Sequence, residues 1–502
     1  MKKILISTVA LSMWLTGCMS GPVRRSSDHT LNDDKGPGGS LVEIIVNYQE
    51  YSAFLPWQKK KPRMRSGYGV AVGRNLVLTV ERLVRNHQLV EMRRARSGKK
   101  IFASVLISDP QAGLALLKVA DAEAMDSIPH LEIAEDVPRT AGLNILQHDE
   151  TSQVQSGNST IRQISVEQLP WTSHSTLAFK LLCDVSVNGE GAPALHHGRL
   201  AGIIIGYESS SRTATMLPYP VIRQFMENAV NLPYEGFASA GFFWSTLVDP
   251  AKRSYLGVSE QNRGILILSV LPGTGAGNTL KANDVILQWD GRDIDPMGYY
   301  NDNDFGRLSF PHLIKHRREP GDTVPVKIIR VGSATNVMVK LSRKMDSDAL
   351  IPENTAGRRA EYLVEGGMII RELTGRYLMA HGSGWEQSVG SRLAHLYHTR
   401  KHMPSEPGER IMILAGVLPD PINIGYQKFR NQLITHINGN PVKNMKDVFR
   451  IYDRDKRVER IRLQSIGVDL VLDSQSLDDA NKRIARSYRL PALSYRVAES
   501  SP

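Results

Sequence analysis

A sequence of 502 residues is too long for a single hydrophobic core, and the usual size of a domain suggests about three folded units. Hydrophobic residues account for 41% and charged residues for 23%, a balance typical of folded globular proteins that excludes a largely disordered chain. The formal net charge is +11, with basic runs at Lys59–Lys61 and Arg93–Arg96, for which we favour a solvated face over a site for anionic lipid head groups or acidic partners.

The N-terminus has the parts of a bacterial lipoprotein signal. Two lysines follow Met1, and Ile4–Leu15 is an apolar run too short to span a bilayer as a mature helix. Residues 15–18 read Leu-Thr-Gly-Cys, a sequence typical of the lipobox where the signal is cleaved and the cysteine acylated. We predict a signal peptide over residues 1–17 and a lipid on Cys18. A secretory signal that happens to contain a cysteine is the alternative.

This signal also predicts the location of the protein, which is the bacterial cell envelope, lipid-anchored and facing the periplasm. Met19 stands where an Asp would retain a lipoprotein at the inner membrane, so we favour the outer membrane. Residues 18–40 are rich in Gly, Ser, Pro, Asp and Arg and predict a flexible tether. Because an exported lipoprotein seldom meets nucleic acid, we expect no nucleic-acid partner.

A first domain is predicted over residues 41–232. Short apolar runs of β type, broken by turns, indicate a barrel or sandwich. A helix follows over Tyr219–Val230, with Pro218 and Pro220 marking its start. The strand candidates are Leu41–Val46, Tyr68–Val72, Leu76–Val80, Leu114–Val119 and Leu200–Tyr207.

Several segments of this domain carry a recognisable pattern. They are Leu55–Lys61, Ser66–Val70, Val77–Thr79, Asp109–Pro110, Leu114–Lys118, Asp184–Leu195 and Leu200–Ile203. In order and spacing they resemble the trypsin-like domain of the Deg/HtrA family, in particular its plant-type branch. The family carries its general base in Thr-Asn-x-His-x-Val, its acid just before an Ile/Leu-Ala-Leu-Leu strand, and its nucleophile in Gly-Asn-Ser-Gly-Gly-Pro.

The resemblance implies that all three catalytic positions are altered here. Arg82 stands for the histidine, and a guanidinium does not accept a proton at any useful pH. Gly113 stands for the acid and offers no carboxylate to an imidazolium. Glu190 stands for the serine, in a segment two residues shorter than the family pattern, which we expect to disrupt the oxyanion hole. Because base and nucleophile touch in a working triad, we predict an ion pair between Arg82 and Glu190 across the cleft, against the alternative of two solvated side chains.

We therefore expect that the protein is not an enzyme but a degenerate serine protease homologue with no catalytic residue. The alternative is a serine-type endopeptidase of the same family with a rearranged active site. Nearby polar side chains occupy no motif position, so we expect them to be loop residues; they are Ser186, His87, His196 and His197. Cys183, in an apolar run, is expected to be a buried thiol.

Two later segments repeat one pattern, and they indicate two copies of a small module. Val-Leu-Pro at 270–272 followed by an apolar strand and Asp-Gly at 290–291 is echoed by Val-Leu-Pro at 417–419 and Asn-Gly at 438–439. We name the predicted domains PDZ1 (residues 237–345) and PDZ2 (residues 357–497), because they resemble the two PDZ domains of plant-type Deg proteins. The second module of that branch serves assembly, which implies a homo-oligomer.

The resemblance also implies a peptide-binding loop in PDZ1, formed by Ala240, Gly241, Phe242 and Phe243. PDZ domains add an extended peptide as a strand and hold its terminal carboxylate on backbone N–H groups. A groove covered by a neighbouring domain, and used only for packing, is the alternative.

In PDZ2 three histidines, His395, His398 and His402, are spaced to share one helix face. No nearby carboxylate or cysteine completes a structural zinc site, so we expect a polar helix surface, no metal and no cofactor.

Together these features predict a mainly β protein: a trypsin-like double β-barrel followed by two PDZ-like α+β domains. The expected function is non-catalytic. The protein would bind envelope proteins or unfolded polypeptides through PDZ grooves, as a scaffold, regulator or chaperone in envelope protein quality control.

Overall fold

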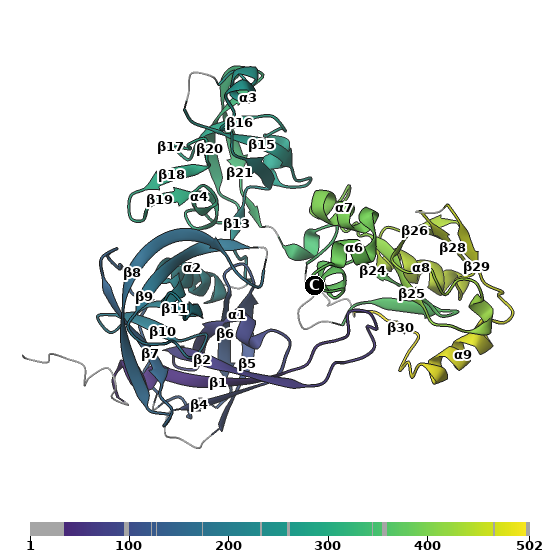
Figure 1. Cartoon of the computed structure of the whole chain (residues 1–502), viewed down its shortest axis with the longest axis horizontal. Helices are drawn as coiled ribbons and strands as arrows, with labels where there is room; N and C mark the ends of the chain where they lie inside the picture. The colour runs from purple at the N-terminus through teal and green to yellow at the C-terminus, as the bar shows by residue number, and fades with distance from the viewer. Residues whose placement is uncertain are drawn as a thin grey trace, which may run out of the picture.

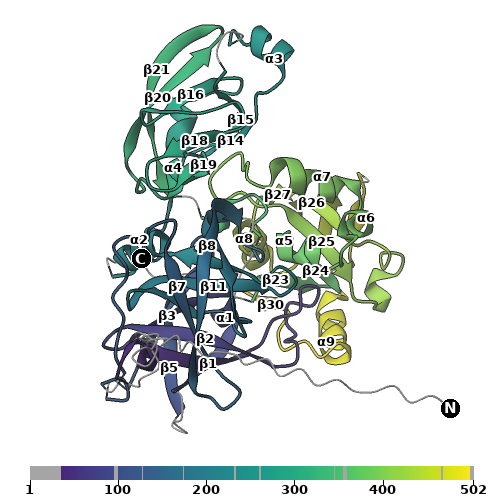
Figure 2. The same cartoon turned by 60° about the vertical axis from the view of Figure 1, so that its left-hand side comes forward.

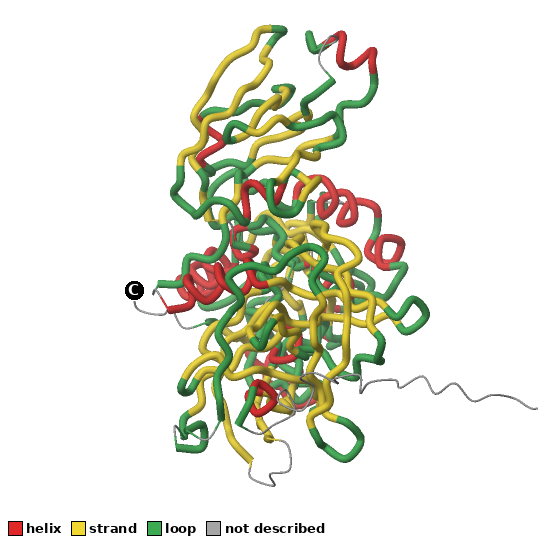
Figure 3. Tube along the Cα trace, turned by 90° about the vertical axis from the view of Figure 1, so that its left-hand side faces the viewer, coloured by secondary structure: helices red, strands yellow, loops and turns green. Residues whose placement is uncertain are grey.

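The computed structural model describes residues 35–497 apart from 95–99, 122, 127, 173, 231–232, 259–261, 344, 354–358 and 465–466. The predicted signal peptide and Cys18 lie outside these residues. Strands dominate the described part of the chain, and helices gather mainly in its C-terminal third (Figure 1, Figure 3). None of the helices described is long and apolar enough to cross a membrane.

The first barrel is closed, with strand order β1-β2-β3-β6-β5-β4. Buried and partly exposed residues alternate along β1, as a strand with one face on a core requires. The last residues of the predicted tether form a 3₁₀ turn, η1 (Pro37–Ser40), and three of its four residues are buried. The folded part of the chain therefore begins before Leu41. The remaining elements are β1 (Leu41–Tyr48), β2 (Arg63–Gly73), β3 (Leu76–Val80), α1 (Glu81–Val84), β4 (His87–Arg94), β5 (Lys100–Asp109) and β6 (Leu114–Val119).

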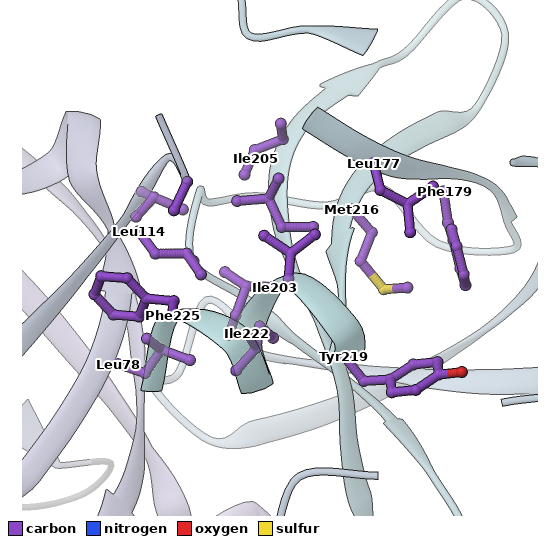
Figure 4. Packing of buried hydrophobic residues seen from close by; sticks show 14 of the residues in the cluster. Leu78, Leu114, Leu177, Phe179, Ile203, Ile205, Met216, Tyr219, Ile222 and Phe225 are labelled. Carbon is purple, nitrogen blue, oxygen red and sulfur yellow. The ribbon is translucent and has the colours of Figure 1, made fainter. Parts of the chain in front are cut away.

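The second barrel is also closed, in the order β10-β11-β12-β9-β8-β7, and it is followed by the helix α2 that the sequence predicts. Figure 4 shows Ile222 and Phe225 of α2 between Ile203 of this barrel and Leu78 and Leu114 of the first, so that one core joins the barrels. The elements are β7 (Gly142–His148), β8 (Val154–Gln168), β9 (Ser175–Cys183), β10 (Pro193–His196), β11 (Arg199–Glu208), β12 (Thr213–Pro218) and α2 (Tyr219–Val230). The predicted double barrel is confirmed.

PDZ1 is built on a sheet with the order β14-β15-β16-β20-β21, and β17 pairs with β16. Its hairpin β18–β19 and helix α4 face the second barrel, above β8 in Figure 1. The elements are β13 (Ala238–Ser239), β14 (Phe242–Ser245), α3 (Pro250–Tyr255), β15 (Ile265–Val270), η2 (Gly275–Asn278), β16 (Val285–Trp289), β17 (Arg292–Asp293), β18 (Tyr299–Asp302), β19 (Gly306–Ser309), α4 (Pro311–Lys315), β20 (Thr323–Arg330), β21 (Ser333–Lys340) and β22 (Ser342–Arg343), before η3 (Asp346–Asp348).

PDZ2 repeats this order as β24-β25-β26-β28-β29, with β27 paired to β26, so the predicted duplication is confirmed in topology. It adds three helices between β24 and β25, and strands β23 and β30 beyond β24. The elements are β23 (Tyr362–Glu365), β24 (Met368–Glu372), α5 (Gly375–Met379), α6 (Trp385–Val389), α7 (Ser391–Arg400), β25 (Met412–Val417), η4 (Pro421–Asn423), β26 (Gln432–Ile437), β27 (Asn440–Pro441), α8 (Met445–Asp455), β28 (Arg460–Leu463), β29 (Asp469–Val471), α9 (Leu477–Ser487) and β30 (Ser494–Tyr495).

A long loop between β1 and β2 joins the first barrel to PDZ2 (Figure 2). Trp57, only 7% exposed, packs there into a cluster of PDZ2 residues that includes Tyr362 and Ile484. The guanidinium of Arg376 binds Glu50 at 3.4 Å and donates to the Tyr51 carbonyl at 2.8 Å. Apolar burial and charged hydrogen bonds therefore both hold PDZ2 against the barrel.

Candidate functional site

Arg82 and Glu190 meet where the two barrels face each other. Arg82 lies on α1, directly after β3, and Glu190 lies in the β9–β10 loop. Arg82 Nη1 lies 2.6 Å from Glu190 Oε1, so the predicted ion pair is present. The Arg82 side chain is 49% exposed and the Glu190 side chain 29%, which makes this a partly solvated contact. The guanidinium also lies over the Trp171 ring, 5.5 Å from its centroid.

The backbone around Glu190 is held against Tyr68 of β2. The Tyr68 N–H donates to the Glu190 carbonyl at 2.7 Å, and the Gly191 N–H donates to the Ile204 carbonyl at 2.8 Å. Gly191 has φ +89°, and a Cβ there would lie 1.9 Å from the Tyr68 carbonyl oxygen. A Cβ on Gly189 would lie 2.6 Å from the Tyr68 ring. Both glycines are therefore required by close backbone approach.

Gln147 of β7 ties the same loop to the second barrel. The Asn188 N–H donates to Gln147 Oε1 at 3.0 Å, and Gln147 Nε2 donates to the Ser186 carbonyl at 2.9 Å. The disruption of an oxyanion hole that the sequence led us to expect stays a prediction.

The electrostatics of the pair follow from partial burial. Burial raises the pKa of Glu190 above its ordinary value, and the nearby charges of Arg82 and Arg65 oppose this only in part. Arg85, directly after α1, binds the buried Glu81 carboxylate through two hydrogen bonds of 2.8 and 2.6 Å. These bonds fix the short helix that carries Arg82. The Arg65 guanidinium in turn donates to the Arg85 carbonyl.

Gly113 lies at the start of β6 with φ +73°, and a Cβ there would lie 3.0 Å from Leu169 Cδ1. Its carbonyl accepts the Glu81 N–H at 2.9 Å, so it shapes the entry to α1. The nearest carboxylate along the chain is Asp109, which accepts the hydroxyl of Tyr234 and two backbone N–H groups. The Asp109 carboxylate therefore binds the segment that follows the first domain.

The other polar residues considered from the sequence lie in separate places. His87 Nδ1 lies 2.9 Å from the Val84 carbonyl, and His196 and His197 stack at 4.1 Å on the β10–β11 turn. Cys183 is 2% exposed, and burial raises the pKa of its thiol, as expected of a structural thiol.

Sequence reasoning missed His148, at the end of β7. Its ring packs edge-on against Tyr68 at 5.4 Å, and its buried Nε2 has no hydrogen-bond partner among the described residues. Burial lowers the pKa of its imidazole, so it is neutral at pH 7. The sequence around His148 matches no family motif. Its place in the site becomes apparent only in the structure, where the end of β7 packs against Tyr68.

The PDZ1 loop predicted to bind peptides leads into an edge strand. Gly241 has φ +71°, and a Cβ there would lie 2.3 Å from Thr274 Oγ1. Its carbonyl accepts the Leu271 N–H at 2.8 Å. Ala240 is buried, and Phe242 packs on Phe310 with ring centroids 6.2 Å apart. Among the described strands β14 pairs only with β15, which leaves its other edge for an added strand.

PDZ2 touches this edge where the His402 ring lies 5.5 Å from the Phe243 ring. His398 instead stacks on Trp385, and α7 ends at Arg400, before His402. The three histidines therefore do not converge. In the described part of the chain no three His, Cys, Asp or Glu side chains are placed to hold a metal ion.

Comparison with known proteins shows what this chain is similar to. A family model described as PDZ domain matches residues 351–494. Protease Do-like 2, chloroplastic, of Arabidopsis thaliana is 25% identical over 90% of this chain and 74% of its own length. Over nine-tenths of its length this chain is therefore similar to proteases of the Deg/HtrA family, and residues 351–494 match a PDZ domain. Protease Do-like 4, mitochondrial, of the same plant is 24% identical over 90% of this chain and 84% of its own length. Among solved structures, an HtrA-type protease AlgW variant with a decapeptide aligns at 15% identity and TM-score 0.49, over 63% of this chain and 97% of its own.

These relatives correct one expectation. The altered residues at positions 82, 113 and 190 led to the prediction that the protein is not an enzyme. That prediction is wrong, because Deg/HtrA relatives that match nine-tenths of the chain are named proteases. The assignment of positions 82, 113 and 190 to the family's triad stays a prediction.

Proposed function

We propose that this Deg/HtrA protein captures unfolded polypeptides or envelope proteins at PDZ1 and serves in envelope protein quality control as a scaffold, regulator or chaperone. The observation that carries the proposal is the loop at Gly241, whose positive φ delivers the chain into the open edge of β14. Such an edge offers a row of backbone donors and acceptors to an extended segment. The lipid anchor at Cys18, an outer-membrane location and a homo-oligomer are parts of the same proposal.

A second candidate is an endopeptidase of the same family with a rearranged site, and the names of the relatives favour it. A carboxylate tied to a guanidinium does not replace a serine hydroxyl, so such a site would use other groups. His148 is the candidate base, because it is a neutral buried imidazole whose Nε2 is not bonded to a described residue. Ser186 lies on the same loop as Glu190 and is the candidate hydroxyl.

The binding proposal is tested with residues 19–502 and fluorescently labelled unfolded casein, by anisotropy. Gly241→Ala forces a Cβ into Thr274 and should weaken binding about tenfold or more, since the loop must shift. Gly291→Ala is the matched control, because Gly291 has φ +74° and open space around its Cα. Equal weakening by both substitutions, or none by either, would overturn the assignment of the site.

The same preparation tests the second candidate by release of acid-soluble peptides from casein. Cleavage that survives Glu190→Ala and falls at least tenfold in His148→Gln would establish a rearranged site. Cleavage unaffected by His148→Gln would contradict the role of this imidazole.

A further inference from the structure

PDZ1 is docked on the second barrel through the end of α4. His316, directly after the helix, inserts its ring between the two domains. Its Nε2 lies 3.3 Å from the Leu177 backbone nitrogen and 3.1 Å from Thr176 Oγ1, both on β9. Its Nδ1 lies 3.1 Å from Gln224 Oε1 on α2. A single imidazole from PDZ1 therefore contacts two elements of the preceding domain.

These partners fix the protonation state of the ring. The Leu177 N–H is a donor only, so Nε2 must accept from it. The remaining ring proton then sits on Nδ1 and is donated to Gln224 Oε1. A second proton on Nε2 would set two N–H groups against each other and remove the hydrogen bond from Leu177, leaving the Thr176 hydroxyl as the acceptor on β9. Protonation of His316 therefore opposes docking at this contact.

Basic residues on α4 and directly after it further oppose protonation of the His316 ring. Lys315 donates to the carbonyls of Gln111 and Ser175 of the barrel domain at 2.6 and 2.7 Å, and lies 5.2 Å from the Phe237 ring centroid. Lys315, His312 and Arg317 each lower the pKa of His316, after burial as the largest cause.

The carboxylates around the contact bind residues other than His316. Asp109, on the barrel side, accepts the hydroxyl of Tyr234. Glu319, which follows α4, accepts from Gln224 Nε2 at 3.1 Å. Asp302 and Asp304 bind Arg317 at 2.9 and 2.8 Å. None of these carboxylates is bonded to His316 to stabilise an imidazolium there.

We propose that His316 is an acid-sensitive latch, which holds PDZ1 on the second barrel at neutral pH and releases it as the pH falls. The latch does not depend on the peptide-binding proposal, because it is defined by the contacts of His316 with β9 and α2 of the preceding domain. Its effect is to change the position of the β14 edge relative to the cleft of Arg82 and Glu190.

The pH window follows from linkage. Undocked His316 takes up a proton near its ordinary pKa of about 6.5, whereas docked His316 does so only well below it. Docking is therefore complete above about pH 6.5 and weakens about tenfold for each pH unit below that value, until the docked pKa is reached. Burial lowers the pKa of Lys315 to about 8, so Lys315 is protonated in both states throughout this range. His312 has a pKa of about 4 and titrates below most of the window.

The test uses residues 19–502 and hydrogen–deuterium exchange of β9 at pH 7.5, 6.5 and 5.5, expressed as protection factors. The protection of the Leu177 amide should fall about tenfold from pH 7.5 to 5.5, and the radius of gyration from X-ray scattering should rise. In His316→Gln the amide oxygen keeps an acceptor for Leu177 but does not titrate, so protection should become independent of pH. His395→Gln, on the exposed face of α7, is the matched control and should behave as the unmodified protein.

Two results would overturn the latch. One is a protection factor that does not change with pH in the unmodified protein. The other is a pH response that persists in His316→Gln and disappears in His312→Gln, which would assign the titration to the interior of PDZ1. His316→Ala, which lacks the acceptor, should show the undocked level of protection at every pH, so that loss of docking is recognised.

Discussion

At the scale of single residues, a charge pair joins the two barrels. Arg82 and Glu190 bind across the cleft, and Gly113 contributes only a backbone carbonyl. Sequence reasoning predicted this pair, because two aligned motifs place their variable residues at one point in space. It could not predict Gln147 or His148, which reach the cleft only through the pairing of β7 with β8 and β10.

The charge pair predicts a measurable titration. Of the two arginines that lower the pKa of Glu190 against the effect of burial, Arg82 has the larger effect. Arg82→Ala should therefore raise the pKa of Glu190 further. Carboxyl carbon NMR of labelled glutamates, assigned with Glu190→Gln, measures the shift. Arg74→Ala, which breaks an exposed pair with Asp126, should leave that titration unchanged. An unaltered pKa in Arg82→Ala would show that the pair does not persist in solution.

Another single-residue prediction concerns Glu365, which is 1% exposed and whose pKa burial raises to about 7, against a hydrogen bond from Asn481. The folded state thus favours the protonated acid, so the free energy of unfolding should fall as pH rises from about 4.5 to 7, by at most about 1.4 kcal/mol per unit. Glu365→Gln should abolish that part of the fall in urea unfolding between pH 5 and 8, whereas Glu150→Gln, on an exposed loop, should not. The same pH dependence in both variants would contradict this assignment.

At the scale of elements, β1, β3, β6 and α2 were predictable because apolar periodicity and two prolines mark them locally. Of the three helices α5–α7, only part of α7 was predicted from the sequence. The histidine spacing predicted a helix through His402, but α7 ends at Arg400 and His402 turns toward Phe243. Pro404 disfavours a helical conformation of the residue before it, so the local sequence did carry a signal for a helix end near Arg400.

Within PDZ2, Asn423 ties two segments together and is fully buried. Its Nδ2 donates to the carbonyls of Gly366 and Leu418 at 2.7 and 2.9 Å. Asn423→Ala leaves two buried acceptors without these bonds and should lower the free energy of unfolding by about 2 kcal/mol, measured in urea. Gln475→Ala, at an exposed position of the same domain, should change it by less than about 0.5 kcal/mol. A cost for Asn423→Ala no larger than for this control would contradict the hydrogen bonds described.

At the scale of the whole molecule, one hydrophobic core runs through both barrels and PDZ1, and a second cluster joins PDZ2 to the loop around Trp57. The segment around Trp57 was noticed in the sequence as part of a family pattern, but its burial in PDZ2 was not predictable, because the partner surface lies some 300 residues away. Likewise the sequence contains His316 without any sign that it lies between PDZ1 and β9.

The loop at Trp57 predicts how the molecule comes apart. Trp57→Ala should cost about 3–5 kcal/mol at the contact and uncouple PDZ2 from the barrels. Scanning calorimetry should then show PDZ2 unfolding in a separate transition at lower temperature. Lys61→Ala, exposed on the same loop, should keep the original profile. A single unshifted transition in Trp57→Ala would mean that other contacts carry the interface.

The most direct test of the central claim is hydrogen–deuterium exchange of residues 19–502 with and without an excess of unfolded casein. If PDZ1 receives polypeptide as an added strand, amides of β14 (Phe242–Ser245) that face the open edge will gain protection, and Gly241→Ala will lose this gain. Protection confined to the cleft of Arg82 and Glu190, with β14 unchanged, would contradict the account and place polypeptide recognition in the barrels.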